Sequence, residues 1–254
     1  YDGTPVIVPT VKDTFEPDID AFEKSITKNT KAVIINSPNN PTGVIYSEDT
    51  LIKMADVLNS KQEEQGTSIL LVADEPYDKI VYDDAKVPSV FKIFKNSVIV
   101  NSFSKSLALP GERIGFIAAN NKIDDVKTLV DGFILCNRIL GFVNAPAIFQ
   151  KVVADCLDAK VDIEGYKKKR DTLYNHLVSI GFECVKPQGA FYLFPKSPIE
   201  DDKEFTKSAA KHNILVVPGS GFGCPGYFRL SYCISLKTIE NSLPAFESLA
   251  KEFR

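Results

Sequence analysis

Short apolar runs alternate with amphipathic stretches through the first half of the chain. The runs are rich in β-branched residues and nearly free of polar ones, which is typical of strands covered on both faces. The stretches between them have polar residues at their starts that can cap helices. A strand–helix–strand order predicts βαβ units and a mainly parallel sheet. We predict strands over Ala32–Asn36, Ile69–Ala73, Val98–Ser102 and Ile114–Ala118, and helices over Asp18–Ser25 and Ser47–Lys61.

The pattern changes in the second half of the chain. Helical periodicity extends from Lys122 to about Leu157, with an interruption near Gly141–Pro146. Beyond it, short strand patterns and amphipathic helices alternate, which predicts a separate α+β layer. We therefore expect an α/β domain over residues 1–158 and a smaller domain over residues 159–254. The predicted strands of the second are Cys184–Pro187, Ala190–Phe194, Ile214–Pro218 and Tyr227–Tyr232, and its helices are Glu164–Ile180, Asp202–His212 and Leu236–Phe253.

Composition excludes several classes of protein. Of the 254 residues, 44% are hydrophobic and 25% are charged, which is ordinary for a globular protein and unlike a disordered or fibrous one. The net charge of −3 offers no basic field for nucleic acid, and no apolar run approaches the ~20 residues of a membrane helix. Five scattered cysteines without a CxxC pattern favour reduced thiols and a cytoplasmic location, and the two distant histidines give no metal site.

Polar segments follow three of the predicted strands. Ser37–Gly43 comes after the first, Asp74–Tyr77 after the second and Phe103–Lys105 after the third. Because ligands of open α/β sheets bind beyond the carboxyl ends of strands, we expect Asn40, Asp74 with Tyr77, and Lys105 at one edge. Each segment alone has an ordinary interpretation, as a turn, a helix cap or a surface string. Their conjunction, in order and at strand ends, favours a ligand site.

These segments and three others resemble the fold-type I pyridoxal-phosphate (PLP) enzymes, specifically the class I/II aminotransferases related to aspartate aminotransferase. The resemblance covers nearly the whole chain in family order. It implies the three-layer αβα large domain of PLP transferases, with a mainly parallel sheet, followed by a smaller α+β domain. The similar segments are Asn36–Gly43, Asp74–Tyr77, Ser102–Lys105, Gly111–Gly115, Gly189–Tyr192 and Phe228–Tyr232.

The resemblance implies roles in binding the PLP ring. Lys105 matches the lysine that forms the Schiff base with pyridoxal 5'-phosphate and moves the substrate's α-proton. Asp74 matches the acid that pairs with the pyridinium nitrogen. Tyr77 and Asn40 match the groups that hydrogen-bond the phenolic oxygen. Core packing is the ordinary alternative for Tyr77.

The resemblance also implies roles toward the phosphate and the substrate. Ser102, Ser104 and Arg113 match the hydroxyl donors and the cation that bind the phosphate. Arg229 matches the arginine that binds the substrate's α-carboxylate, beside Asn40. An arginine inside an apolar strand needs a partner for its charge, unless strand alternation places it on a wet face. A surface ion pair is the ordinary alternative for Arg113.

The chain begins at Tyr1 and its sole methionine is Met54. Family members start well before the residue that matches Tyr1, so we expect an N-terminal part to be missing. In the family, that part supplies a glycine-rich turn for the phosphate, an aromatic ring stacked on the cofactor and a tyrosine from the other subunit of a homodimer. We therefore expect this piece alone to bind PLP weakly, to be inactive, and to expose apolar sheet edges to association.

Three functions fit the resemblance. The first is transfer of an amino group between an amino acid and a 2-oxo acid, through Lys105. The second is a PLP-dependent lyase or cyclopropane amino-acid synthase, which would use the same lysine and arginine. The third is a non-catalytic PLP-fold binding domain. Arg229 accounts for recognition of any amino acid's carboxylate and leaves the side chain of the substrate open.

Overall fold

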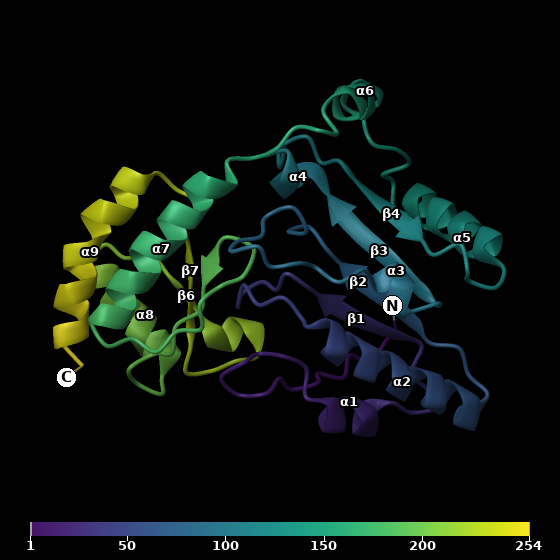
Figure 1. Ribbon diagram of the computed structural model, residues 1–254, viewed down its shortest axis with the longest axis horizontal. Coiled ribbons are helices and arrows are strands. Elements are labelled where there is room, and N and C mark those ends of the chain that lie inside the picture. The colour runs from purple at the N-terminus through teal and green to yellow at the C-terminus, as the bar shows by residue number, and fades with distance from the viewer. Residues whose placement is uncertain (1, 254) are drawn as a thin grey trace. The chain divides into compact units, whose positions relative to one another are not determined.

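A computed structural model describes residues 2–253 of the chain (Figure 1). Contacts group these residues into two compact units. The first unit contains the chain up to Pro38, Tyr46–Lys79 and Lys86–Val161. The second unit contains Asn39–Ile45, Ile80–Ala85 and the chain from Asp162 onward.

The first unit is built on a four-stranded sheet. Its strands are β1 (Ala32–Asn36), β2 (Leu70–Asp74), β3 (Ser97–Ser102) and β4 (Gly115–Ala119), in the order β1-β2-β3-β4. The first three are parallel, and β4 runs antiparallel to β3. All four strands lie within a residue of their predicted positions, and the mainly parallel α/β sheet is confirmed.

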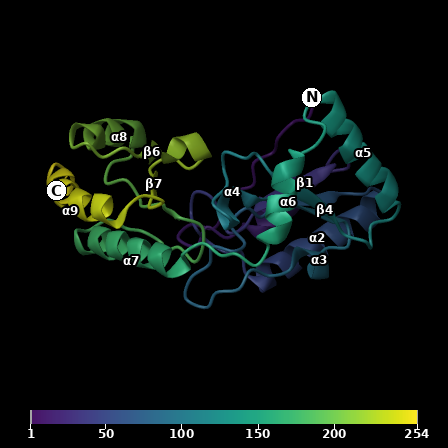
Figure 2. The same cartoon turned by 90° about the horizontal axis from the view of Figure 1, so that it is seen from above.

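Helices lie on both sides of this sheet: α2 and α3 on one side and α5 on the other (Figure 2). The Ser47 hydroxyl caps α2 by accepting the N–H of Thr50 at 3.2 Å, as the sequence predicted for this residue. The one-turn helices α3 and α4 are too short to show a helical period, so they were not predicted. The helices are α1 (Ile19–Ser25), α2 (Glu48–Gln65), α3 (Val90–Ile93), α4 (Phe103–Ser106), α5 (Val126–Ile139) and α6 (Ala147–Asp155).

One face of the sheet forms the core of the first unit. Ile35 of β1 is paired with Ala73 of β2, and both are buried together with Leu51 and Met54 of α2. The neighbouring residue Ile34 points to the other face, because successive strand residues alternate, and it is 74% exposed. Helix α5 has no buried residue. The second face of the sheet therefore leaves apolar surface open to solvent.

The second unit is an antiparallel sheet with three helices. The strands have the order β5-β7-β6, and the strand predicted at Cys184–Pro187 is wrong. There the Pro187 carbonyl accepts from the buried guanidinium of Arg170 at 2.9 Å instead of joining a ladder. The elements are β5 (Tyr192–Leu193), β6 (Val217–Pro218), β7 (Phe228–Ser231), α7 (Ile163–Ser179), α8 (Asp202–Lys211), α9 (Leu236–Lys251) and the 3₁₀ helix η1 (Gly219–Phe222).

Two segments from the first half of the sequence, residues 39–45 and 80–85, complete the second unit. The carbonyl of Gly43 accepts the N–H groups of residues 188 and 189, each at 2.9 Å. The Tyr82 hydroxyl donates to the Ala190 carbonyl at 2.5 Å. The second unit is thus assembled from parts of the chain that are more than a hundred residues apart.

No helix of the described residues is long and apolar enough to cross a membrane.

Candidate active site

Asp74 and Asn36 end neighbouring strands and face each other. They are paired in the register of β1 and β2, and Asn36 Nδ2 donates to Asp74 Oδ2 at 3.1 Å and to the Asp74 carbonyl at 3.0 Å. Burial raises the pKa of the half-buried Asp74 carboxyl, and the hydrogen bond from Asn36 opposes that rise. The hydrogen bond from Asn36 therefore offsets only part of the cost of burying the Asp74 charge, and a nearby cation would favour the ionised carboxylate. Tyr77, three residues on, is buried.

No role was assigned to the Asn36 side chain from the sequence, so its contact with Asp74 was missed. The second strand was predicted to end at Ala73, one residue short of Asp74, which hid this pairing. Asn36 is the last residue of β1 as Asp74 is of β2, and the ends of neighbouring parallel strands meet at one edge.

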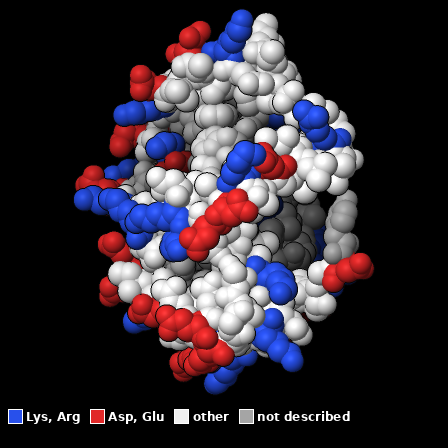
Figure 3. All heavy atoms as spheres, turned by 90° about the vertical axis from the view of Figure 1, so that its right-hand side faces the viewer, with Lys and Arg blue, Asp and Glu red and all other residues white. Residues whose placement is uncertain are grey.

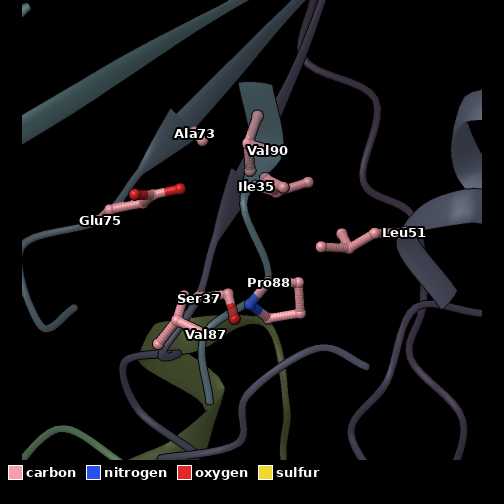
Figure 4. Close-up of a pocket in the computed structure, with 8 residues that line it drawn as sticks. All are labelled: Ile35, Ser37, Leu51, Ala73, Glu75, Val87, Pro88 and Val90. Atoms are coloured by element: carbon pink, nitrogen blue, oxygen red, sulfur yellow. The ribbon is translucent and has the colours of Figure 1, made fainter. Parts of the chain in front are cut away.

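Glu75, next to Asp74, turns the opposite way. It lines a small cavity of about 10 Å³, with room for about one water molecule, beside Ser37 at the end of β1 (Figure 4). Burial, together with the negative charges of Asp78 and Asp74, raises the pKa of Glu75 to about 7. Two adjacent carboxyl groups therefore occupy different surroundings at the end of one strand.

The end of β3 supplies two hydroxyl groups and a lysine. Ser102 caps α4: its Oγ accepts the N–H of Ser104 at 3.1 Å and donates to Ser104 Oγ at 2.7 Å. Lys105 is the third residue of α4 and is half-buried. The end of β3 and this short helix thus place two hydroxyls and an amine within four consecutive residues. They follow the strand that pairs with β2, which ends at Asp74.

A glycine lets β4 approach these hydroxyls. Gly115 is paired with Ser102, and a Cβ on it would lie 2.5 Å from the Asn101 carbonyl oxygen, so only glycine fits. Arg113, two residues earlier, has a left-handed backbone with φ 52° and is exposed. Its Nη1 donates to the Pro110 carbonyl at 2.7 Å. The guanidinium thus folds onto its own turn and has further N–H donors to offer.

In the second unit, the guanidinium of Arg229 in β7 contacts one side-chain amide and two aromatic rings. Its Nη1 donates to Asn40 Oδ1 at 2.9 Å. Its guanidinium carbon lies 4.6 Å from the ring centres of both Tyr192 and Phe222. Arg229 is half-buried, and no carboxylate of the described residues forms an ion pair with it. Phe222 could not be found from the sequence, because no local pattern reports its contact with Arg229, which depends on tertiary structure.

The predicted site residues therefore fall into two groups. Asn40, which follows β1 in the chain, contacts Arg229 and belongs with it to the second unit. The other six predicted residues belong to the first unit: Asp74, Tyr77, Ser102, Ser104, Lys105 and Arg113.

Comparisons with known proteins give a consistent result. Residues 1–246 match the family model described as aminotransferase class I and II. The chain is 34% identical over 244 residues to a probable aspartate aminotransferase of Methanocaldococcus jannaschii, covering 91% of this chain and 61% of that protein. It is 34% identical over 256 residues to the aspartate aminotransferase of Bacillus subtilis, covering 95% of this chain and 63% of that protein.

A solved structure extends the likeness. An amino transferase from Eubacterium rectale is 45% identical to the chain and superposes with a TM-score of 0.94, over 97% of this chain and 62% of that one. The chain thus spans about three fifths of the length of the relatives it matches. Since the family model matches nearly the whole chain, this protein belongs to the class I and II aminotransferase family.

Proposed function

We propose that the chain provides the catalytic lysine and the substrate-binding arginine of a PLP-dependent aminotransferase, which exchanges an amino group between an amino acid and a 2-oxo acid. The observation that supports it most is the state of Arg229. This arginine is half-buried, held by Asn40 and two rings, and has no carboxylate partner among the described residues. A half-buried guanidinium without an ion-pair partner is suited to bind the carboxylate of a ligand.

The first-unit residues fit the cofactor of this family, whose members depend on PLP. When bound, PLP supplies an aldehyde that attaches amines reversibly and a ring that accepts electrons from the substrate's α-carbon. The Asp74 carboxylate, whose pKa burial raises, would be favoured by the protonated ring nitrogen. The hydroxyls of Ser102 and Ser104 would donate to the phosphate, and Arg113 would add a cation.

The remaining residues have roles that follow from their chemistry. Lys105 would hold the cofactor covalently, and its Nζ, once released, would take a proton from the substrate's α-carbon and return one to the product. Tyr77 and Asn40 would hydrogen-bond the cofactor's phenolic oxygen. Asn40 and Arg229 together would orient the substrate's carboxylate, which fixes the α-carbon relative to the base.

We extend the proposal to the organisation of the protein. Residues 1–158 would act as the cofactor-binding domain and residues 159–254 as the smaller domain. The protein would work as a homodimer in the cytoplasm. Five free thiols suit a reducing compartment.

The test is spectroscopic and then catalytic. The chain is mixed with PLP beside a Lys105→Ala variant, and the visible absorbance is recorded. We expect the chain to show an absorbance band that Lys105→Ala lacks. The same comparison is made with the complete enzyme, and equal bands with and without Lys105 there would overturn the assignment of Lys105.

A product assay separates aminotransferase from lyase. The complete enzyme is given amino acids with 2-oxoglutarate, and both glutamate and free ammonia are measured. Glutamate formation supports amino transfer. Ammonia without glutamate would identify a lyase, and neither product together with retained PLP binding would identify a binding domain.

A further inference from the structure

Two aromatic rings contact the Arg229 guanidinium, and they reach it from different elements. We refer to Tyr192 and Phe222 as the aromatic clamp. Tyr192 lies in β5, which pairs directly with β7, so the sheet itself fixes its place beside Arg229. Phe222 ends η1, which is not part of the sheet. The position of the second ring therefore depends on what holds this single 3₁₀ turn.

A buried carboxylate holds that turn. Asp202, at the start of α8, is 3% exposed, and its Oδ2 accepts the N–H of Ser220 at 2.6 Å. No cation of the described residues pairs with Asp202. Burying a carboxylate costs free energy that one backbone hydrogen bond offsets only in part. The hydrogen bond therefore ties the Ser220 backbone, and with it η1, to the start of α8.

Close backbone packing holds the other end of η1. Gly219 donates to the Tyr227 carbonyl at 2.7 Å, and a Cβ on Gly219 would lie 2.3 Å from the Cys224 carbonyl oxygen. Only glycine allows this approach. The Phe222 ring also packs edge-on against Phe194, with ring centres 6.3 Å apart. The turn is thus fixed at its start, at its middle and at its last side chain.

We propose that Phe222 is a positioning residue for the carboxylate-binding arginine, and that Asp202 holds Phe222 in place through Ser220. The inference rests on the proposed function, because it assumes that Arg229 receives a carboxylate. A ring over the guanidinium leaves the in-plane N–H groups as its donors, and Asn40 takes one of the five. Because the guanidinium is already ordered, less side-chain freedom is lost when the carboxylate binds.

The test follows Arg229 itself by NMR. The full chain is labelled with ¹⁵N-arginine, the Arg229 Nε–H resonance is assigned with Arg229→Lys, and acetate is titrated as the probe. Phe222→Leu removes the ring, and Phe222→Tyr is the matched control that keeps it. We expect the acetate midpoint of Phe222→Leu to be at least about threefold higher than that of the unsubstituted chain, and Phe222→Tyr to be unchanged.

A second variant and a second measurement separate positioning from a general loss of structure. Asp202→Asn keeps the shape of the side chain and weakens its hold on Ser220, and we expect its acetate midpoint to rise as well. Thermal unfolding of each variant is recorded, so that the comparison uses folded protein only.

Two results would overturn the inference. An acetate midpoint in folded Phe222→Leu and Asp202→Asn equal to that of the unsubstituted chain would overturn it alone and leave the carboxylate site standing. An Arg229 resonance that acetate does not move in the unsubstituted chain would overturn both the inference and the carboxylate site of the proposed function.

Discussion

At the scale of single residues, neighbours in sequence have different chemistry because strand alternation sends them to opposite sides. Asp74 meets Asn36 at the sheet edge, whereas Glu75 lines a cavity of about 10 Å³. Both carboxyl groups have a raised pKa from burial, but only that of Asp74 is opposed by a hydrogen bond. Glu75 thus keeps its proton up to near-neutral pH, whereas the hydrogen bond from Asn36 favours the ionised form of Asp74, which suits the pairing with a cation proposed for it.

Replacing Glu75 by glutamine should flatten the pH dependence of stability. The native pKa of about 7 lies above the ordinary value of 4.5, so the stability linked to Glu75 is complete below pH 4.5 and is lost as pH rises through about 7. Between pH 5 and pH 8 the unsubstituted chain should lose about 2 kcal/mol more unfolding free energy than Glu75→Gln, after allowance for partial exposure. Urea unfolding at the two pH values measures the unfolding free energy of both proteins. An equal loss of unfolding free energy in the unsubstituted chain and in Glu75→Gln would contradict the prediction.

Removing the amide beside Asp74 should weaken cofactor binding. Asn36→Ala takes away a hydrogen bond to a charged group and lets the pKa of Asp74 rise further, so less of the carboxylate is ionised. We expect the PLP dissociation constant of the complete enzyme to rise about tenfold, measured by absorbance titration. Asn59→Ala, at an exposed position of α2, is the control and should leave it unchanged. A constant that Asn36→Ala leaves unaltered would remove Asn36 from the site.

At the scale of elements, glycines decide where segments meet. Gly43 and Gly66 both have positive φ, at +71° and +59°. A Cβ on Gly43 would lie 2.5 Å from Pro187 Cβ, whereas a Cβ on Gly66, at the end of α2, would meet open space. Both positions therefore need a left-handed backbone, but only Gly43 lies against neighbouring atoms that leave no room for a side chain.

The pair of alanine variants separates these two causes. Gly66→Ala should cost about 1 kcal/mol of unfolding free energy, the strain of a left-handed alanine. Gly43→Ala should cost about 3 kcal/mol, because overlap with the backbone and side chain of residues 187–189 adds to that strain. Urea unfolding of both variants gives the comparison. Equal costs would show that the 187–189 segment yields freely.

The strands and long helices could be predicted from sequence because each has a period and a cap. Ser47 caps α2 as expected, and Asp18, one of two candidate caps with Asp20, caps α1. The four strands of the first unit lie within a residue of their predicted positions. The direction of β4 could not be predicted, because an apolar strand pattern is the same in either direction. One-turn elements such as α4 and η1 lack a period altogether. Contacts such as that between Phe222 and Arg229 depend on tertiary structure.

At the scale of the whole molecule, apolar surface is concentrated on one part of the first unit. Ile139 at the end of α5 is 72% exposed and Phe142 beyond it is 74% exposed. Figure 3, which shows the side of the molecule that carries α5, has charged groups of both signs set among broad uncharged areas. Apolar surface of this extent favours association.

Charge placed on this surface should reduce self-association. We expect Ile139→Lys combined with Phe142→Lys to lower the average mass of the chain in sedimentation at a fixed concentration. Leu215→Lys is the matched control, because Leu215 is 88% exposed in the second unit, away from these residues in sequence. A mass lowered equally by the control would mean that net charge, and not this surface, governs association.

The way the second unit is assembled also sets a schedule for folding during synthesis. Residues 39–45 and 80–85 leave the ribosome early, yet their hydrogen-bond partners lie at residues 188–190. At the usual pace of ~5–20 residues per second, Gly43 waits on the order of ten seconds for those partners. The parallel strands β1, β2 and β3 have all emerged by then, so the nascent first unit must hold two unpaired loops open until the C-terminal third arrives. A pause in translation after residue 161 would prolong that state, in which the nascent chain is most in need of a chaperone.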